Sequence, residues 1–186
     1  MNERAKFDTP ALFDRLVELE ITFENHKHPP LRTVAESQTL RGELPGAHIK
    51  NLFLRDKKRR YLLVTVLEER AIDLKWLRHT IGAHGTLSFG SSDALMDLLG
   101  VEPGAVTPLG VINDTEGVVT AFLDKALMTA DMVNAHPLRN DMTTAFSATD
   151  LERFMIAENH PPRIIDFDTA AYLRCSESLE LSACNR

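Results

Sequence analysis

The stretch Ala47-His48-Ile49-Lys50-Asn51-Leu52-Phe53-Leu54 decides how this chain folds. A cationic segment, Arg55-Asp56-Lys57-Lys58-Arg59-Arg60, follows it directly, and then comes the most hydrophobic run of the chain, Tyr61 to Leu67. Two apolar segments joined by a short polar connection are typical of a β-hairpin. The sequence therefore predicts strands at 47–54 and 61–67, with a positively charged tip between them.

Lys50 stands near the start of a strand that is otherwise largely apolar. An unpaired ammonium group is costly to bury, so its position needs an explanation. In one interpretation the side chain lies at the sheet edge and keeps its ammonium in water. In the other it points into a pocket, where it meets an anionic or carbonyl group of a substrate. The spacing of residues alone leaves both interpretations open.

The rest of the chain predicts short strands mixed with four or five short helices. Helices are expected at 10–19, with Thr9 as N-cap, at 94–99 and at 148–158. A short helix is also expected after Asp73, and another should begin at Thr33 or Glu36 and end near Gly42 or Pro45. Strands are expected at 21–25, 87–89, 132–135, 143–146 and 163–167, and a second hairpin at 109–112 and 118–123. No regular βα alternation and no internal repeat are visible. We therefore expect one α+β domain over 1–186 with a mixed, largely antiparallel sheet, a core at about 10–167 and a C-terminal tail, 168–186, without a clear role.

Composition limits the classes of function. The chain has 186 residues and a formal net charge of −6, which argues against general nucleic-acid binding but leaves room for a local positive patch. Its two cysteines, Cys175 and Cys184, form no disulfide framework and indicate a reducing, cytoplasmic setting. No apolar run reaches the roughly 18 residues of a membrane span, and Met1 to Arg4 do not begin a signal peptide.

The common catalytic signatures are absent from the sequence. It contains no GxSxG, HExxH, CxxC or P-loop motif. Ser91 and Ser92 are better explained as helix caps than as nucleophiles. His26 and His28 are two residues apart but have no carboxylate partner nearby in sequence, so a loop role is favoured over a zinc site. These observations give no support to a metal centre or a catalytic triad.

Three stretches remain as candidates for chemistry. The first is Lys50-Asn51. The second is Gly104 to Pro108, in which glycine permits close approach of the backbone to a ligand and proline restricts the loop; it is equally consistent with a plain helix-to-strand connection. The third, His136-Pro137-Leu138-Arg139-Asn140-Asp141, gathers polar groups at a strand end, where it is either a site or a polar turn.

Taken together and in this order, these stretches resemble the YbaK/ProX superfamily of aminoacyl-tRNA editing domains, over about Pro10 to Phe167. The Lys-Asn-Leu-Phe-Leu and His-Pro-Leu-Arg-Asn-Asp forms are most similar to the free-standing Ala-tRNA(Pro) deacylases (ProXp-ala). The resemblance implies hydrolysis of an amino acid wrongly attached to tRNA(Pro), with no cofactor or metal. It implies that the partner is the acceptor end of that tRNA, with a transient association with prolyl-tRNA synthetase, and no membrane or DNA.

The resemblance also implies roles for individual residues. Lys50 would be essential for catalysis, Gly104 and Pro108 would shape the loop that walls the amino-acid pocket, and His136 would line the same pocket beside Asn51. An aminoacyl ester is already activated, so holding the carbonyl, placing a water and stabilising the oxyanion suffice. The substrate's own vicinal hydroxyl is a candidate for activating that water. A small apolar pocket would exclude proline; the candidates for its walls are Val34, Leu52, Val106 and Leu138.

Contacts to the rest of the tRNA are expected from cationic residues. The segment from Arg55 to Arg60, or Arg32 and Arg41, would meet phosphates of the acceptor stem, although a solvated hairpin tip is the simpler interpretation. Other functions remain open: a deacylase for Cys- or Ser-charged tRNA, a non-catalytic tRNA-binding module, or an esterase acting on a small molecule.

Overall fold

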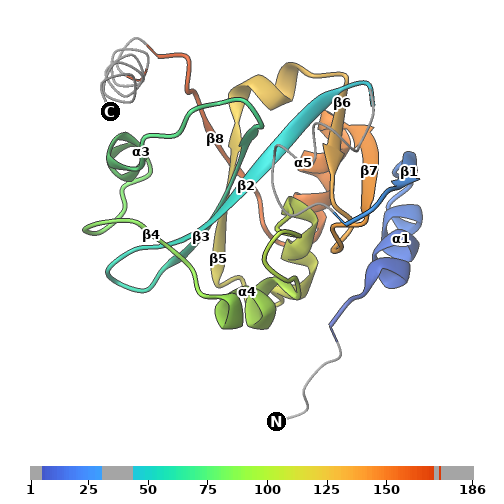
Figure 1. The fold of residues 1–186 in the computed structure, drawn as a ribbon, viewed down its shortest axis with the longest axis horizontal. Coiled ribbons are helices and arrows are strands. Elements are labelled where there is room, and N and C mark those ends of the chain that lie inside the picture. The colour runs from blue at the N-terminus through green and yellow to red at the C-terminus, as the bar shows by residue number, and fades with distance from the viewer. Residues whose placement is uncertain (1–5, 31–43, 170–171, 173–186) are drawn as a thin grey trace.

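The protein is described by a computed structural model in which residues 6–30, 44–169 and 172 are placed. Its centre is an eight-stranded sheet with the order β1-β7-β6-β2-β3-β5-β8, and β4 pairs with β2 (Figure 1). The strands are β1 (Phe23–Lys27), β2 (Ala47–Arg55), β3 (Tyr61–Leu67), β4 (Ser88–Phe89), β5 (Val119–Asp124), β6 (Met132–Ala135), β7 (Met142–Ser147) and β8 (Arg163–Ile165). Four pairings are antiparallel and three are parallel, so the sheet is mixed.

Helices cover both faces of this sheet. The helical elements are α1 (Thr9–Glu18), α3 (Leu74–Thr80), α4 (Ser92–Leu99), α5 (Ala148–Ala157) and two 3₁₀ helices, η1 (Pro108–Asn113) and η2 (Lys125–Thr129). The larger core lies on the face covered by α1, α4, α5 and η1, where fully buried side chains such as Leu16, Leu99 and Phe154 pack against the sheet. The opposite face carries a smaller core around Leu77 of α3, with Phe167 and Tyr172. Tyr172 thus contributes to the core although it lies in the segment expected to be a tail.

β2 is the strand on which the site depends. It pairs with β3 along most of its length, from Ile49 to Arg55. Its other edge pairs with β6 only at Ala47 and His48, and with β4 only at Leu54 and Arg55. Among the described residues, therefore, no strand covers residues 49–53 on that edge. This interruption opens the sheet beside Lys50.

The structure corrects two local expectations. Asp8, rather than Thr9, caps α1 by accepting the N–H of Ala11 at 3.0 Å, and the Thr9 hydroxyl instead donates to Pro137 O at 2.6 Å. The expected second hairpin does not form because its first strand, 109–112, lies in η1. Pro108 begins that 3₁₀ helix and the Thr107 hydroxyl caps it, so the apolar side chains are buried in a helical turn.

Other expectations are confirmed within a residue or two. The first hairpin, α4 with its caps Ser91 and Gly100, and α5 all form where the pattern places them. The predicted helix beginning at Thr33 or Glu36 lies outside the described residues. No helix in the described part of the chain is long and apolar enough to cross a membrane.

Candidate functional site

Lys50 and Asn51 are neighbours in β2 but lie on opposite faces of the sheet, because successive side chains of a strand alternate. Lys50 pairs in register with Val66, which belongs to the smaller core. Asn51 pairs with Thr65 on the other face. The two residues that the sequence groups together therefore perform separate tasks.

Polar side chains gather on the face that carries Lys50. The pairing of His48 with Asn134 brings β6 into register with β2, so Asn134 and His136 share this face. β7 adds Thr143, since the pairing of Ala135 with Thr144 places Thr143 on the same face as His136. The polar side chains that alternate onto this face are His48, Lys50, Glu68, Asn134, His136 and Thr143.

A cavity of about 30 Å³ lies where β2 and β6 diverge. Its lining residues are His48, Ile49, Asn51, Glu68, Asn134, Ala135, His136 and Thr143. Two sequence-predicted site residues, Asn51 and His136, thus line one cavity, which Lys50 does not line itself. The volume is enough for a water molecule or a group of similar size.

Asn134 provides an unsatisfied acceptor in this cavity wall. It is 4 % exposed, and its side-chain nitrogen donates to Pro45 O at 2.9 Å. Its Oδ1 is buried and accepts no hydrogen bond. Since a buried acceptor without a partner costs free energy, this atom is prepared to receive a donor from a bound molecule.

His136 is held in one tautomer. Its Nδ1 lies 2.8 Å from Met142 O, which can only accept, so Nδ1 carries the proton. Burial lowers the pKa of His136, and the nearby His28 ring, at 6.1 Å between centroids, lowers it further. The hydrogen bond to Met142 and the charge of Asp141 oppose this without reversing it. At neutral pH the imidazole is uncharged, and its Nε2, which has no hydrogen-bond partner among the described residues, is an acceptor.

Lys50 is only partly withdrawn from water. Burial lowers the pKa of its ammonium group, and the carboxylate of Glu68 partly restores it. Glu68 is 8 % exposed and also lines the cavity. The ammonium is therefore a partly desolvated positive charge within the electrostatic influence of a buried carboxylate, and its effect on a nearby group exceeds that of a charge in water.

Asn51 ties β2 to the loop from Gly104 to Pro108. Its Nδ2 donates to Val106 O at 2.8 Å, and its Oδ1 accepts from the Thr65 hydroxyl at 2.7 Å. Gly104 has a φ of +93°, which explains the need for glycine, and Pro108 is buried at the start of η1. Neither lines the cavity. The N–H of Ala105 is already bonded to Glu102 O, so any donation to a substrate must come from other N–H groups of this loop.

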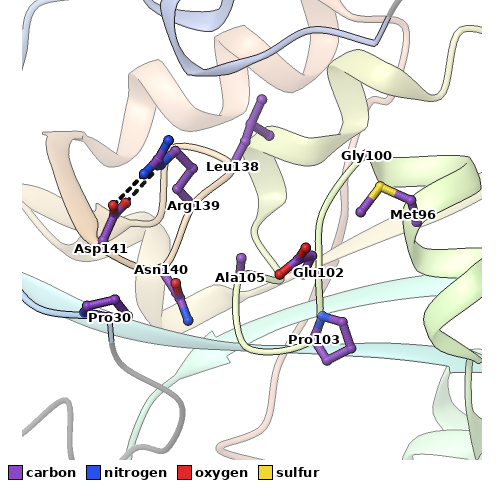
Figure 2. A pocket seen from close by; sticks show the side chains of 10 residues that line it. All are labelled: Pro30, Met96, Gly100, Glu102, Pro103, Ala105, Leu138, Arg139, Asn140 and Asp141. Atoms are coloured by element: carbon purple, nitrogen blue, oxygen red, sulfur yellow. Dashed lines mark hydrogen bonds and ion pairs between the residues drawn. The ribbon is translucent and has the colours of Figure 1, made fainter.

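A second, larger pocket of about 420 Å³ separates this loop from the turn after β6. Figure 2 shows the segment from Gly100 to Ala105 on one side and the turn from Leu138 to Asp141 on the other. Arg139 and Asp141 form an ion pair at its rim, with Nε to Oδ1 at 2.9 Å. The third stretch thus lines this pocket with Leu138 to Asp141, whereas of the second stretch only Ala105 lines it, and Gly104 and Pro108 do not.

The expected pocket walls divide among different places. Leu138 lines the larger pocket, Val106 packs at the edge of the larger core, and Leu52 lies on the face of Lys50, where it packs against the smaller core. Val34, Arg32 and Arg41 lie outside the described residues. Glu68, Asn134 and Thr143 were missed. The alternation of Met-Val-Asn-Ala-His in β6, which puts Asn134 on the face of His136, was a signal available in the sequence.

Among the described residues, no three His, Cys, Asp or Glu side chains are placed to hold a metal ion. The small cavity is lined by a neutral imidazole, a carboxylate and an amide oxygen, and the ammonium group of Lys50 lies on the same face of the sheet.

Comparisons with known proteins identify the family of this chain. Residues 28–154 match the model of the aminoacyl-tRNA editing domain family. A prolyl-tRNA synthetase associated domain-containing protein 1 from Bos taurus is 40 % identical over 162 residues, covering 85 % of this chain and 94 % of its own. The prolyl-tRNA editing protein ProX of Acetoanaerobium sticklandii is 37 % identical over 157 residues, covering 84 % and 95 %.

Solved structures share the fold. A crystal structure described as a candidate trans-editing enzyme for prolyl tRNA synthetase superposes with a TM-score of 0.64 at 18 % identity, covering 87 % of this chain and 98 % of the other. The family match spans most of the chain, and the sequence relatives align over nearly their full length. The chain belongs to the aminoacyl-tRNA editing domain family.

Proposed function

We propose that this protein is a trans-editing deacylase that hydrolyses the ester of Ala-tRNA(Pro). The observation that carries the proposal is the polar cluster on one sheet face, where Glu68, Asn134 and His136 line a small cavity and Lys50 lies on the same face next to it in β2. The relatives named for prolyl-tRNA editing support the choice of tRNA(Pro) and a transient association with prolyl-tRNA synthetase. Such a substrate is met in the cytoplasm.

The residues suit hydrolysis of an activated ester. Attack of water on the carbonyl carbon places negative charge on the carbonyl oxygen, and a preformed positive charge nearby stabilises that state. We assign this task to Lys50, which also attracts the phosphate of the 3′-terminal adenosine. His136 accepts a hydrogen bond through Nε2, either from the attacking water or from the ribose hydroxyl next to the ester. No metal or cofactor is needed for this step.

The cavity supports recognition of alanine. Asn134 Oδ1 and the Glu68 carboxylate supply acceptors for the α-ammonium group of the amino acid. A volume of about 30 Å³ takes a water molecule or a methyl group, and so small a space favours the side chain of alanine over the ring of proline. Exclusion by size would spare correctly charged Pro-tRNA(Pro), and discrimination of about 1–3 kcal/mol per methylene is expected from such a site.

A deacylation panel tests the proposal. Ala-, Pro-, Ser- and Cys-tRNA(Pro) would be given to the wild type, to Lys50→Ala, and to Lys75→Ala as a control that removes an exposed lysine on α3. Loss of alanine alone, abolished by Lys50→Ala and unaffected by Lys75→Ala, is the expected result. Hydrolysis of Ser- or Cys-tRNA(Pro) in place of Ala-tRNA(Pro) would show that the enzyme is a deacylase specific for a different amino acid. Absence of hydrolysis with all four would refute the enzyme and favour a tRNA-binding module.

A further inference from the structure

The tip of the β2–β3 hairpin carries a concentration of positive charge that is unusual for a chain with a net charge of −6. Arg55, Lys57, Lys58, Arg59 and Arg60 are all exposed, whereas the one carboxylate among them, Asp56, is 3 % exposed. Asp56 is turned inward and bonded to Arg60. Four cations remain to face the solvent without a neutralising neighbour in the tip.

What distinguishes these cations is that several without partners lie together. Arg15, Arg70, Arg139, Arg153 and Lys125 each pair with at least one carboxylate. Within the described residues, no ion pair or side-chain hydrogen bond engages the hairpin-tip cations, namely Arg55, Lys57, Lys58 and Arg59. Other unpaired lysines, such as the exposed Lys27 and Lys75, stand alone in sequence. A cluster of unpaired cations marks a place where an external anion would gain the most.

The tip is also held in a fixed shape. Asp56 Oδ1 accepts the N–H groups of Lys58 and Arg60 at 2.8 and 3.0 Å, and its Oδ2 accepts the His84 N–H at 3.1 Å. Burial by itself would raise the pKa of Asp56, but these N–H groups and the Arg60 guanidinium bring it to about 2. A fixed tip presents its charges without a large loss of backbone entropy on binding.

An exposed aromatic side chain lies next to this tip. Phe89 in β4 is 67 % exposed and pairs with Leu54 of β2. Leu54 and Lys50 alternate onto the same face, so Phe89 lies on the face of the sheet that carries Lys50. At about 3.3 Å per residue along β2, the tip is roughly 20 Å from Lys50. Cations beside an exposed aromatic ring are a combination suited to a nucleic-acid strand, whose phosphates and bases both find partners.

We infer that the hairpin tip and Phe89 form the surface on which the acceptor end of the substrate tRNA docks, with stem phosphates on Lys57, Lys58 and Arg59 and an unpaired base on Phe89. This inference rests on the proposed function for the identity of the RNA. In this arrangement β2 contributes to two contacts with the substrate. Lys50 lies near the ester, and Arg55 at the other end of the strand lies near the acceptor stem.

Binding of uncharged tRNA(Pro) tests this surface without relying on catalysis. The variant is Lys58→Gln/Arg59→Asn, where asparagine suits the left-handed φ of +61° at position 59. The control is Lys125→Gln/Arg163→Gln, which removes the same charge from η2 and β8. In a salt titration followed by fluorescence anisotropy, the slope of log affinity against log salt should fall by roughly one for each tip charge removed and stay near wild type in the control. Phe89→Ala should weaken binding roughly fivefold or more.

The outcomes separate this inference from the proposed function. If the wild type hydrolyses none of the charged tRNAs but its binding to tRNA still depends on the hairpin tip, the docking surface is supported and the proposed deacylase activity is refuted. If the tip variant binds with the affinity and salt slope of the wild type, or the wild type binds no tRNA at all, the docking surface is overturned. Hydrolysis of an alanyl ester on a short 3′ oligonucleotide lacking the stem should be unchanged in the tip variant.

Discussion

The side-chain amide of Asn51 donates to the main-chain carbonyl of Val106 at 2.8 Å, so a strand and a loop 55 residues apart are held by one hydrogen bond. The same amide accepts from Thr65, which is fully buried. Asn51 therefore acts on the site by positioning the Gly104–Pro108 loop, while Lys50 beside it faces the other side of the sheet.

Asn51→Leu should release this loop. We expect deacylation to fall by roughly tenfold or more, and the free energy of unfolding to drop by about 1–3 kcal/mol because Val106 O and the Thr65 hydroxyl lose their partner. Thr65→Val is the matched control, since it removes the Thr65 bond but leaves the bond to Val106. Single-turnover kinetics measure the deacylation rate, and urea titrations measure the free energy of unfolding. Equal deacylation rates in the two variants would contradict a role for the hydrogen bond between Asn51 and Val106.

Glu68 should set the alkaline limit of activity. Burial lowers the pKa of Lys50 and Glu68 opposes it, so Glu68→Gln should lower that pKa further. If the ammonium form is needed, the rate corrected for uncatalysed ester hydrolysis should decline at a lower pH in Glu68→Gln than in the wild type. Glu69→Gln, at the exposed neighbouring position, should leave the profile unchanged.

His136 should set the acid limit. Because burial lowers its pKa, activity should persist below the ordinary histidine value of about 6.5 and be lost only when Nε2 becomes protonated. His28→Asn removes a neighbouring charge that lowers this pKa, so the acid limb should move to higher pH. His136→Asn should lower the rate by roughly 10²-fold or more and abolish that limb. If the loss of activity at acid pH persists in His136→Asn, another titrating group is responsible for it.

The α-ammonium group of the substrate should be required. If Asn134 Oδ1 receives it, N-acetylalanyl-tRNA(Pro) should be hydrolysed at least roughly tenfold more slowly than Ala-tRNA(Pro), because the acetyl group removes the charge and adds bulk to a cavity of about 30 Å³. Asn134→Leu should reduce this preference. Equal rates on both substrates would leave Asn134 with a purely structural role.

A buried pair away from the site should control stability. His160 donates to Asp114 Oδ2 at 2.9 Å, and the two side chains are 2 % exposed. Burial opposes the charge on His160, but the hydrogen bonds to Asp114 and to the Glu158 carbonyl, together with the charges of these two carboxylates, outweigh it and raise the His160 pKa. The stabilisation is thus complete below the unfolded pKa of about 6.5 and is lost as pH rises through the higher folded value.

His160→Gln should reduce the free energy of unfolding by about 3–5 kcal/mol near pH 6, and the difference from wild type should shrink at higher pH. Urea titrations at several pH values measure this. His26→Gln, at a partly exposed histidine with only a 3.7 Å contact to Glu24, should change stability by no more than about 0.5 kcal/mol at any pH.

Patterns of local sequence were enough to predict the hairpin, most helices and the α+β class, because burial on a strand or helix repeats with a short period. They were not enough for the segment 109–112. Its apolar run is compatible with a strand, and the helical turn is explained by Pro108 and the Thr107 cap at its start together with the contacts that Asp114 makes after it with the N–H groups of Val118 and Val119 and with His160.

The site was predictable in part for a similar reason. Lys50, Asn51 and His136 stand out as polar residues at strand ends, but which of them share a face depends on strand register. The pairing of His48 with Asn134 decides that His136 lies with Lys50, and this pairing joins strands more than 80 residues apart. Glu68 and Asn134 are visible as site residues only after that register is known.

The uncovered edge of β2 between its pairings with β6 and β4 has a consequence for how substitutions act on the small cavity. A peptide group is the same whatever side chain its residue carries, so the main chain along this edge keeps its hydrogen-bonding groups through most substitutions. Ala135 and Ile49 line the cavity, and replacing either one would change the space in it while the main chain of the strand stays the same. An interrupted sheet thus allows a cavity to be reshaped by single amino-acid changes without rebuilding the strand that borders it.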